Sequence, residues 1–468
     1  MARYSMQADD NNLPPEQRRV KDYNPTTPWS GADNGNPKED YVVPSEGNID
    51  AVITPEKTTK AKKNDQSAVI EQDAVVFTQS VVNEAITKGA SDIHFEPKRE
   101  NYQIRFRVDG VLQKFDERPL VEFNKILNSV KVLGDMDIAE HSIPQDGHIE
   151  FVQERVPEKR NYRTGSDSDS RGHFFDIRVS IFPSVNGEVI VMRILNRQNA
   201  LLTIQDLGME KTSLDALHDA LLTSYGMILV TGPTGSGKTT TLYSVLNELK
   251  DEEKNIITLE DPIEFHLEWL RQCEIRVDRN FTFEKAMESV LRQDPDVLMV
   301  GEIRDPHTAE HAVRSALVGR IVGSTIHANT TIGTIARLVE MGIPRSIIGH
   351  TLNAIIAQRL VRKNCTHCRE KYTPNEAVLK HFHLENQEGP FYRGVGCEEC
   401  GHTGYQGRIG VFSLMTFDDK LRNLLFDNRP LIEINEFAIQ KGMRSLRQDA
   451  SVKVLAGETT AEEASRVI

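Results

Sequence analysis

Hydrophobic and polar positions divide the chain into a polar N-terminal stretch and a longer part with regular periods. Residues 1–66 are rich in Asn, Asp, Pro, Lys and Thr and lack a sustained apolar period, which predicts a disordered tail or tether. Beyond it, apolar residues recur at helical spacing over 74–86, and Gly89 is well placed to end that helix. The remainder of residues 67–196 changes to short alternating runs, which predicts an α+β domain.

Within this domain, strands are predicted for the alternating runs at 90–97, 145–151, 175–180 and 188–194. Residues 102–112 are typical of a hairpin, with an Asp-Gly pair in its turn. Residues 120–140 are helical by pattern. Residues 152–173 are charged and rich in Ser and Asp, which predicts a mobile surface loop.

From 211 to 362, apolar runs alternate with amphipathic helices, which predicts an α/β domain with a mostly parallel sheet and helices on both faces. Residues 197–210 are expected to link it to the preceding domain, and residues 413–468 to form a C-terminal helical region. Polar residues follow the apolar runs directly. Because the carboxyl ends of parallel strands meet at one sheet edge, these polar residues are expected to share one crevice. The apolar runs are 227–231, 256–259, 297–300 and 321–326.

A glycine-rich stretch joins the first of these runs to a predicted helix at 240–246. Its spacing is that of a phosphate-binding loop, whose backbone N–H groups surround a phosphate at a helix N-terminus. We expect Lys238 to reach the β- and γ-phosphates of ATP and the Thr239 hydroxyl to ligate Mg²⁺. A glycine-rich turn without a ligand is the alternative. The expected nucleotide-binding residues are Gly232, Pro233, Thr234, Gly235, Ser236, Gly237, Lys238, Thr239 and Thr240.

Carboxylates and a histidine follow the other runs. Glu260, Asp261 and Glu264 follow the second run, and Glu260 and Asp261 are also expected among the nucleotide-binding residues. One of the three carboxylates is expected to polarise the attacking water as a general base. Glu302 follows the third run, where a carboxylate holds Mg²⁺ or its water, and His327 follows the fourth and could hydrogen-bond the γ-phosphate. Each of these carboxylates could instead cap a helix or pair with a surface lysine.

Four of the five cysteines form two Cys-x-x-Cys pairs, Cys365 with Cys368 and Cys397 with Cys400. Two such pairs can place four thiolates tetrahedrally around one Zn²⁺, which leaves no open position for catalysis. The pattern predicts a structural zinc module over 363–412, with four unmetallated thiols as the alternative. Cys273 stands alone in a polar stretch, and no chemical role is expected for it.

Composition narrows the classes of function. A chain of 468 residues is expected to hold several domains. Its net charge of −13 argues against a nucleic-acid backbone as the main partner, because phosphate contacts need clustered Lys and Arg. No apolar run approaches the roughly 18 to 20 residues of a membrane span. The N-terminus also lacks the apolar core of a signal peptide, so a soluble intracellular protein is expected.

The ordered set of motifs resembles the secretion ATPases of type II secretion and type IV pilus assembly. The resemblance extends over about residues 74–468, and chance agreement at so many ordered motifs is negligible. Besides the phosphate loop and the two cysteine pairs, it rests on residues 90–94, 105–110, 144–147, 260–264, 294–296, 301–305, 324–327 and 404–408.

The resemblance implies a RecA-like P-loop ATPase domain preceded by a PAS-like α+β domain, in a homohexamer that holds ATP between the two. Glu264 is then the general base, Glu302 the metal-site glutamate and His327 part of a histidine box. Arg105, Arg107 and Arg178 become candidates to reach the phosphates. The enzyme would hydrolyse ATP to drive pilus extension or type II secretion through an inner-membrane platform protein. It would be cytoplasmic and peripheral to the inner membrane, associating with it only through partners.

Two other functions are compatible with a RecA-like hexamer. One is a pilus retraction motor, although the cysteine module favours the extension and secretion branch, since retraction relatives typically lack it. The other is a nucleic-acid translocase, and the negative net charge of the chain argues against it.

The chain departs from the family at His141, Ser142, His148 and Val189, where relatives often carry Arg. Its polar tail also lacks the folded domain with which many relatives dock to the platform.

Overall fold

The computed structural model describes residues 65–153, 173–196, 202–387 and 389–468. The predicted tail therefore lies outside the described residues, except that α1 (Asp65–Thr87) begins at its last two positions. Residues 154–172 of the predicted loop and residues 197–201 of the predicted linker also lie outside them. None of the described helices is long and apolar enough to cross a membrane.

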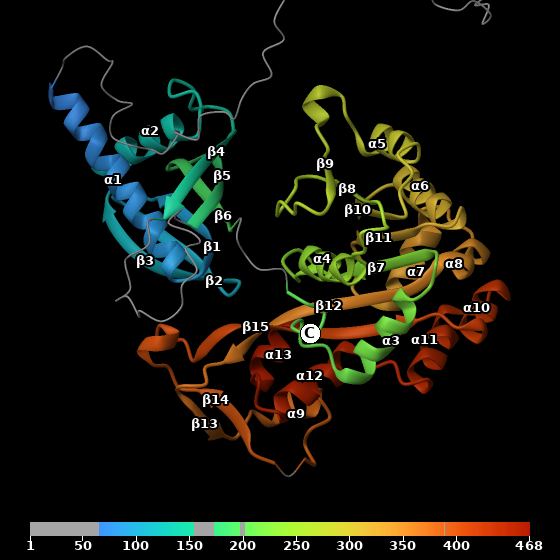
Figure 1. The fold of residues 1–468 in the computed structure, drawn as a ribbon. Coiled ribbons are helices and arrows are strands. Elements are labelled where there is room, and N and C mark those ends of the chain that lie inside the picture. The colour runs from blue at the N-terminus through green and yellow to red at the C-terminus, as the bar shows by residue number, and fades with distance from the viewer. Residues whose placement is uncertain (1–64, 154–172, 197–201, 388) are drawn as a thin grey trace, which may run out of the picture. The chain divides into compact units, whose positions relative to one another are not determined.

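The first part of the chain folds as one antiparallel sheet with two helices packed on it (Figure 1). The strand order is β3-β2-β1-β6-β5-β4. Side chains alternate along β2, where Ile104 and Phe106 are buried and the arginines between and beyond them are not. The strands are β1 (Ala90–Pro97), β2 (Asn101–Val108), β3 (Val111–Pro119), β4 (Gln145–Gln153), β5 (His173–Ser184) and β6 (Gly187–Asn196).

The helix predicted over 120–140 is shorter than expected. A 3₁₀ turn, η3 (Leu120–Glu122), leads into α2 (Phe123–Leu133), which ends at Gly134. Asp135 then adopts a left-handed backbone with φ 55°, which interrupts the helical path. Apolar residues of α1 and α2, such as Val81 and Ile126, share one core with the sheet.

The second part is built on a seven-stranded sheet in the order β15-β12-β7-β11-β10-β8-β9. Every neighbouring pair is parallel except β12 with β15, so the predicted parallel-rich α/β fold is confirmed. The strands are β7 (Gly226–Thr231), β8 (Ile256–Glu260), β9 (Arg271–Glu274), β10 (Val297–Ile303), β11 (Ile321–Ile326), β12 (Leu352–Asn364) and β15 (Tyr405–Thr416).

Helices cover both faces of this sheet, as predicted, and each face has its own core. Met227 and Leu229 of β7 lie in one core, whereas Ile228 and Val230 lie in the other. A strand buried on both faces needs an apolar side chain at every position, which explains the continuous apolar run. The first core holds α5 (Phe283–Val290), α6 (Pro306–Leu317), α7 (Thr331–Glu340), α8 (Arg345–Thr351), α10 (Asp419–Phe426) and α11 (Leu431–Gln440), and the second holds α3 (Lys211–Leu221) and α4 (Lys238–Glu248).

The cysteine module is inserted between two neighbouring strands of the main sheet. β12 leads into it, and β15 returns from it to pair antiparallel with β12. The first residues of β15 fall within the expected range of the module, yet they belong to the main sheet. The module contains β13 (Arg369–Tyr372), α9 (Glu376–His381), β14 (Phe391–Gly394) and the 3₁₀ turn η5 (Glu398–Cys400). The helices α12 (Leu446–Leu455) and α13 (Ala461–Val467) pack beside it. Outside the module, a further 3₁₀ turn, η4 (Val277–Arg279), follows β9.

Candidate functional site

The glycine-rich loop connects the end of β7 to the start of α4, at the carboxyl edge of the parallel strands. Gly232 has φ 153°, and a Cβ atom there would lie 2.5 Å from the carbonyl oxygen of Gln358. Gly237 caps α4 with a left-handed backbone at φ 85°. Thr239 and Thr240 occupy the first turn of α4, where free N–H groups and the helix dipole favour an anion.

Polar side chains of the loop are suited to a polyphosphate. Lys238 Nζ donates to the carbonyl oxygens of Gly232 (3.1 Å) and Pro233 (3.0 Å). Burial lowers the pKa of Lys238; the negative charge of Glu302 opposes this shift and the positive charge of Arg359 adds to it. The Ser236 hydroxyl is buried without a hydrogen-bond partner among the described residues. Phosphate oxygens would give both side chains acceptors, so these residues fit the predicted ATP.

Glu302 and His327 come together with Lys238 at this edge of the sheet. Glu302 lies near the end of β10, and its Oε2 is 3.3 Å from His327 Nε2. Arg304 forms a close ion pair with the other oxygen of Glu302. The glycine at 301 has a steric reason, because a Cβ there would lie 3.1 Å from the carbonyl oxygen of Leu259 in β8.

The acidic residues after β8 occupy different environments. Glu260 is buried and accepts hydrogen bonds from the Tyr243 hydroxyl, from Thr258 Oγ1 (2.5 Å) and from Gln272 Nε2 (3.1 Å). These three donors give its carboxylate a role inside the fold that sequence reasoning did not anticipate. Asp261 is exposed, and its charge acts on Arg304.

Glu264, the predicted general base, lies in a partly buried environment. Burial raises its pKa, the charges of Arg178 and Arg193 oppose that shift, and Glu260 adds to it. A carboxylate with a raised pKa accepts a proton more readily than an ordinary one.

The three arginines suggested by the resemblance have different partners in this structure. Arg105 and Arg107 lie two residues apart on β2, so both face the same side of their sheet. Arg105 forms an ion pair with Glu96 at 2.5 Å, and Arg107 Nε lies 3.6 Å from a carboxylate oxygen of Asp92. Arg178 instead donates to the carbonyl oxygen of Ile263 at 3.0 Å, immediately before Glu264.

Sequence reasoning missed two arginines of this region, Arg193 and Arg359. Arg193 is paired directly with Arg178 in the register of β5 and β6, and it donates to Asp92 at 3.1 Å. Arg359 lies on β12 beside the phosphate loop. No sequence motif marks either residue. A correct pairing of β5 with β6 would have identified Arg193, because it places this residue opposite Arg178.

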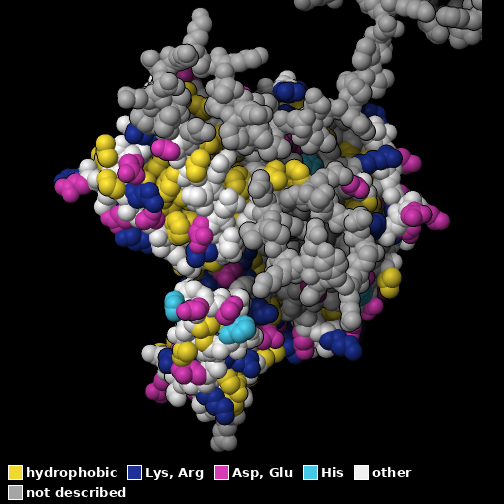
Figure 2. Space-filling view, turned by 60° about the vertical axis from the view of Figure 1, so that its left-hand side comes forward, with side chains coloured by type: hydrophobic (Ala, Val, Ile, Leu, Met, Phe, Trp, Pro, Cys, Tyr) yellow, Lys and Arg dark blue, Asp and Glu magenta, His cyan; other side chains and the backbone are white. Residues whose placement is uncertain are grey.

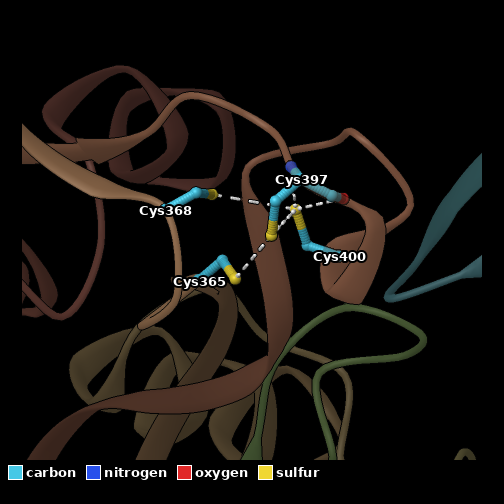
Figure 3. A group of neighbouring side chains, drawn as sticks. All are labelled: Cys365, Cys368, Cys397 and Cys400. Carbon is cyan, nitrogen blue, oxygen red and sulfur yellow. Dashed lines mark hydrogen bonds between the residues drawn. The ribbon is translucent and has the colours of Figure 1, made fainter.

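The four paired cysteines converge, as the sequence predicts (Figure 3). Their sulfur atoms all lie within 4.8 Å of one another. A tetrahedral zinc centre with Zn–S bonds of about 2.3 Å places its sulfurs about 3.8 Å apart. The distances of 3.8 Å for Cys365–Cys397, 3.9 Å for Cys368–Cys400 and 3.7 Å for Cys397–Cys400 match that spacing.

Backbone N–H groups around the cysteines favour thiolates. Those of Cys397 and Gly404 point at the sulfur of Cys400, at 3.2 and 3.3 Å, and that of Gly396 points at Cys368, at 3.3 Å. Burial raises the pKa of Cys400, but the N–H groups of Cys397 and Gly404, together with the neighbouring thiols, bring that pKa to about 6. The pKa of Cys368 is raised by burial. The N–H group of Cys400 lowers the pKa of Cys397, but burial and the neighbouring thiols outweigh it and raise that pKa to about 11, so one thiolate is favoured within the cluster. Four converging sulfurs with such donors fit a Zn²⁺ ion.

The known proteins that this chain resembles belong to one family of secretion and pilus proteins. The family model described as "Type II/IV secretion system protein" matches residues 64–466. Type II secretion system protein E of Pseudomonas aeruginosa is 43% identical over 401 residues, covering 85% of this chain and 76% of that protein. The type IV pilus assembly ATPase PilB of Thermus thermophilus is 38% identical over 84% of this chain, which spans 43% of its length. The solved structure of the pilus retraction motor PilT with bound ADP is 25% identical, with a TM-score of 0.54, covering 83% of this chain and 96% of that one.

Proposed function

Because the chain belongs to the type II/IV secretion system protein family, we propose that it hydrolyses ATP to drive pilus assembly or type II protein secretion. The observation that carries this proposal is the meeting of Lys238, Glu302 and His327 at the phosphate loop. A strand edge with a glycine cradle, a lysine and a carboxylate has the parts that phosphoryl transfer to water requires.

Each residue has a definite part in the proposed reaction. The backbone N–H groups of the loop and Lys238 bind the β- and γ-phosphates, and the Ser236 hydroxyl donates to a phosphate oxygen. Thr239 and Glu302 would hold Mg²⁺, which neutralises charge on the phosphates when it is bound. Glu264 takes a proton from water as the water oxygen bonds to the γ-phosphorus and the bond to the bridging oxygen of ADP breaks. His327 donates to the γ-phosphate.

The arginines complete the proposed site. Arg178 is adjacent to the segment that carries Glu264, so it is the strongest of the three candidates for charge compensation in the transition state. Arg105 and Arg107 have carboxylate partners within their own sheet, and reaching a phosphate would require them to exchange those partners.

The proposed assembly is a homohexamer that acts with an inner-membrane platform protein. It lies in the cytoplasm and reaches the membrane through that partner.

The cysteine module is proposed to bind Zn²⁺ structurally. Four thiolates fill a tetrahedral shell, so the ion would supply folding energy and no open coordination site.

The cysteine module also helps to distinguish pilus assembly from pilus retraction, because its presence favours the assembly and secretion branch of the family. The likeness to a solved retraction motor keeps retraction as the second candidate. Cells lacking this protein that still assemble pili but cannot shorten them would favour retraction.

Nucleic-acid translocation is disfavoured by charge. On the face shown in Figure 2, Lys and Arg side chains of the described residues are interspersed with Asp and Glu. A nucleic-acid motor needs a continuous basic track, and the whole chain carries a net charge of −13. Strong stimulation of ATP hydrolysis by DNA would reverse this conclusion.

The proposed function is tested by replacing the phosphate-loop lysine. Lys238→Ala removes the cation that holds the phosphates, so ATP turnover of the assembled protein should fall by about 100-fold or more. Lys254→Ala, at an exposed position before β8, serves as the matched control and should leave turnover unchanged. Turnover is measured as phosphate release per chain, with the oligomeric state checked by light scattering. Normal turnover in Lys238→Ala would contradict the assigned site.

A further inference from the structure

The phosphate loop rests on a strand that sequence motifs do not mark. β12 pairs with β7 as far as Ala357 opposite Thr231, and its next residues continue beside the loop. A Cβ atom at Gly237 would lie 3.0 Å from the Gln358 amide nitrogen. The Gln358 Oε1 atom accepts a hydrogen bond of 2.6 Å from the buried hydroxyl of Thr241 in α4. β12 thus supports both ends of the loop.

Arg359, the next residue of β12, is a buried cation with only neutral partners. Its exposed fraction is 8%. Its Nη1 donates to the carbonyl oxygen of Gln358 at 2.9 Å, and its Nη2 donates to the carbonyl oxygen of Asn329 at 3.1 Å. Among the described residues it forms no ion pair with a carboxylate, and burial lowers its pKa. A cation in this environment is costly unless an anion is bound nearby.

The position of Arg359 identifies where that anion would lie. A Cβ atom at Gly232, the first glycine of the loop, would be 3.2 Å from Arg359 Nη1. The charge of Arg359 also acts on Lys238. Two cations that repel one another at the same loop are both stabilised by a polyphosphate bound between them.

Arg359 also holds the segment that carries His327. Asn329, its hydrogen-bond partner, lies two residues beyond His327. The hydroxyl of Thr231, immediately before the loop, donates to the carbonyl oxygen of Ala328 at 2.8 Å and accepts from the Ala328 N–H at 2.9 Å. The backbone just after His327 is therefore fastened to the start of the phosphate loop at two points.

We propose that Arg359 is a positioning residue of the nucleotide site. It fastens the 327–329 segment against the phosphate loop, and its unpaired charge strengthens the binding of the ATP phosphates. The inference rests on the proposed ATPase function. Arginine suits both tasks, because its planar fork donates to two separate carbonyl oxygens at once, whereas a lysine supplies the charge from a single point.

The two tasks are separated by two substitutions in the full-length chain. Arg359→Lys keeps the charge and loses the fork, so affinity for Mg·ATP should change by less than about threefold while kcat falls at least about tenfold. Arg359→Gln loses both, so affinity should also fall by about tenfold or more. The matched control is Arg362→Lys, three residues further along β12, where the arginine pairs with Glu463 at 2.7 Å. It should keep the affinity and kcat of the unmodified chain.

Thermal unfolding of each variant without nucleotide separates positioning from folding. Wild-type affinity and kcat in Arg359→Gln would overturn the inference. The inference would also be overturned if the losses of affinity and kcat in the Arg359 variants were fully explained by the fraction of each variant that is unfolded. If the unmodified chain does not bind or hydrolyse Mg·ATP at all, the proposed ATPase function fails instead, and the two failures are therefore distinguishable.

A double substitution tests whether Arg359 acts through His327. If it does, kcat of His327→Ala with Arg359→Lys should equal that of His327→Ala alone, because the segment then carries nothing to position. Two independent losses that multiply in the double variant would overturn the positioning role.

Discussion

At the residue scale, the same side-chain type has different chemistry in different surroundings. Glu260 and Glu264 are four residues apart, and the sequence places both in one acidic cluster. Glu260 has three hydrogen-bond donors inside the fold, whereas burial raises the pKa of Glu264. The second is the better candidate to take a proton, because the oxygens of Glu260 already accept from donors inside the fold.

The raised pKa of Glu264 predicts the acidic limb of the pH profile. A base acts only when deprotonated, so kcat should fall as pH drops through the raised pKa, which lies above the ordinary value of 4.5. Glu264→Gln should lower kcat by about 100-fold and remove that limb. Phosphate release measured across pH checks this, with Glu268→Gln, exposed in the same loop, as the control. An unchanged limb in Glu264→Gln would assign the base elsewhere.

At the element scale, the last helix is fastened to β12 by a buried ion pair. Glu463 of α13 is 1% exposed at its side chain and accepts from Arg362 at 2.7 Å and Arg466 at 2.6 Å. Burial raises its pKa, but the hydrogen bonds from these arginines lower it to about 2. The same strand thus contacts the phosphate loop through Gln358 and Arg359 and contacts α13 through Arg362, three residues further on.

This ion pair predicts a stability that depends on pH. A folded-state pKa below the unfolded value of 4.5 stabilises the fold above pH 4.5, and that stability is lost as pH falls toward 2. Glu463→Gln should therefore lower the free energy of unfolding by about 3 kcal/mol at pH 7.

The difference between Glu463→Gln and the unmodified chain should shrink below pH 4.5, as followed by urea unfolding. Glu436→Gln, exposed on α11, is the matched control and should unfold like the unmodified chain at every pH. A difference that stays constant from pH 7 to pH 3 would show that Glu463 is not ionised in the fold.

At the scale of the whole molecule, the cysteine module is an insertion held by the main sheet. Its two ends are neighbouring strands, and one of them also supports the phosphate loop. The module has a small core shared with α12 and α13. A metal centre is a common way to stabilise such a small unit, because its own apolar core is limited.

The proposed zinc centre predicts a metal-dependent stability. The purified protein should contain about one Zn²⁺ per chain, and Cys400→Ser should lose the metal and unfold at a lower temperature. Elemental analysis and thermal unfolding measure both effects. Cys273→Ser, which alters the cysteine outside the cluster, should leave metal content and unfolding temperature unchanged. Purification without chelators that yields no metal would contradict the zinc assignment.

By itself, the sequence determined the features that contiguous residues create. The phosphate loop, the two cysteine pairs and the apolar runs of the sheet are each complete within a few residues, so local spacing sufficed. The helix after residue 120 was predicted too long, because the apolar pattern continues past the point where Gly134 and Asp135 change the backbone.

Only the tertiary structure decided which distant residues join the site. Strand register sets Arg193 beside Arg178, and the place of β12 next to β7 brings Arg359 to Gly232. No local pattern encodes such pairings, since they depend on sheet order, which is set by packing of the whole domain. The same packing gives Glu260 and Glu264 different burial and partners, and it leaves Glu264 with the raised pKa.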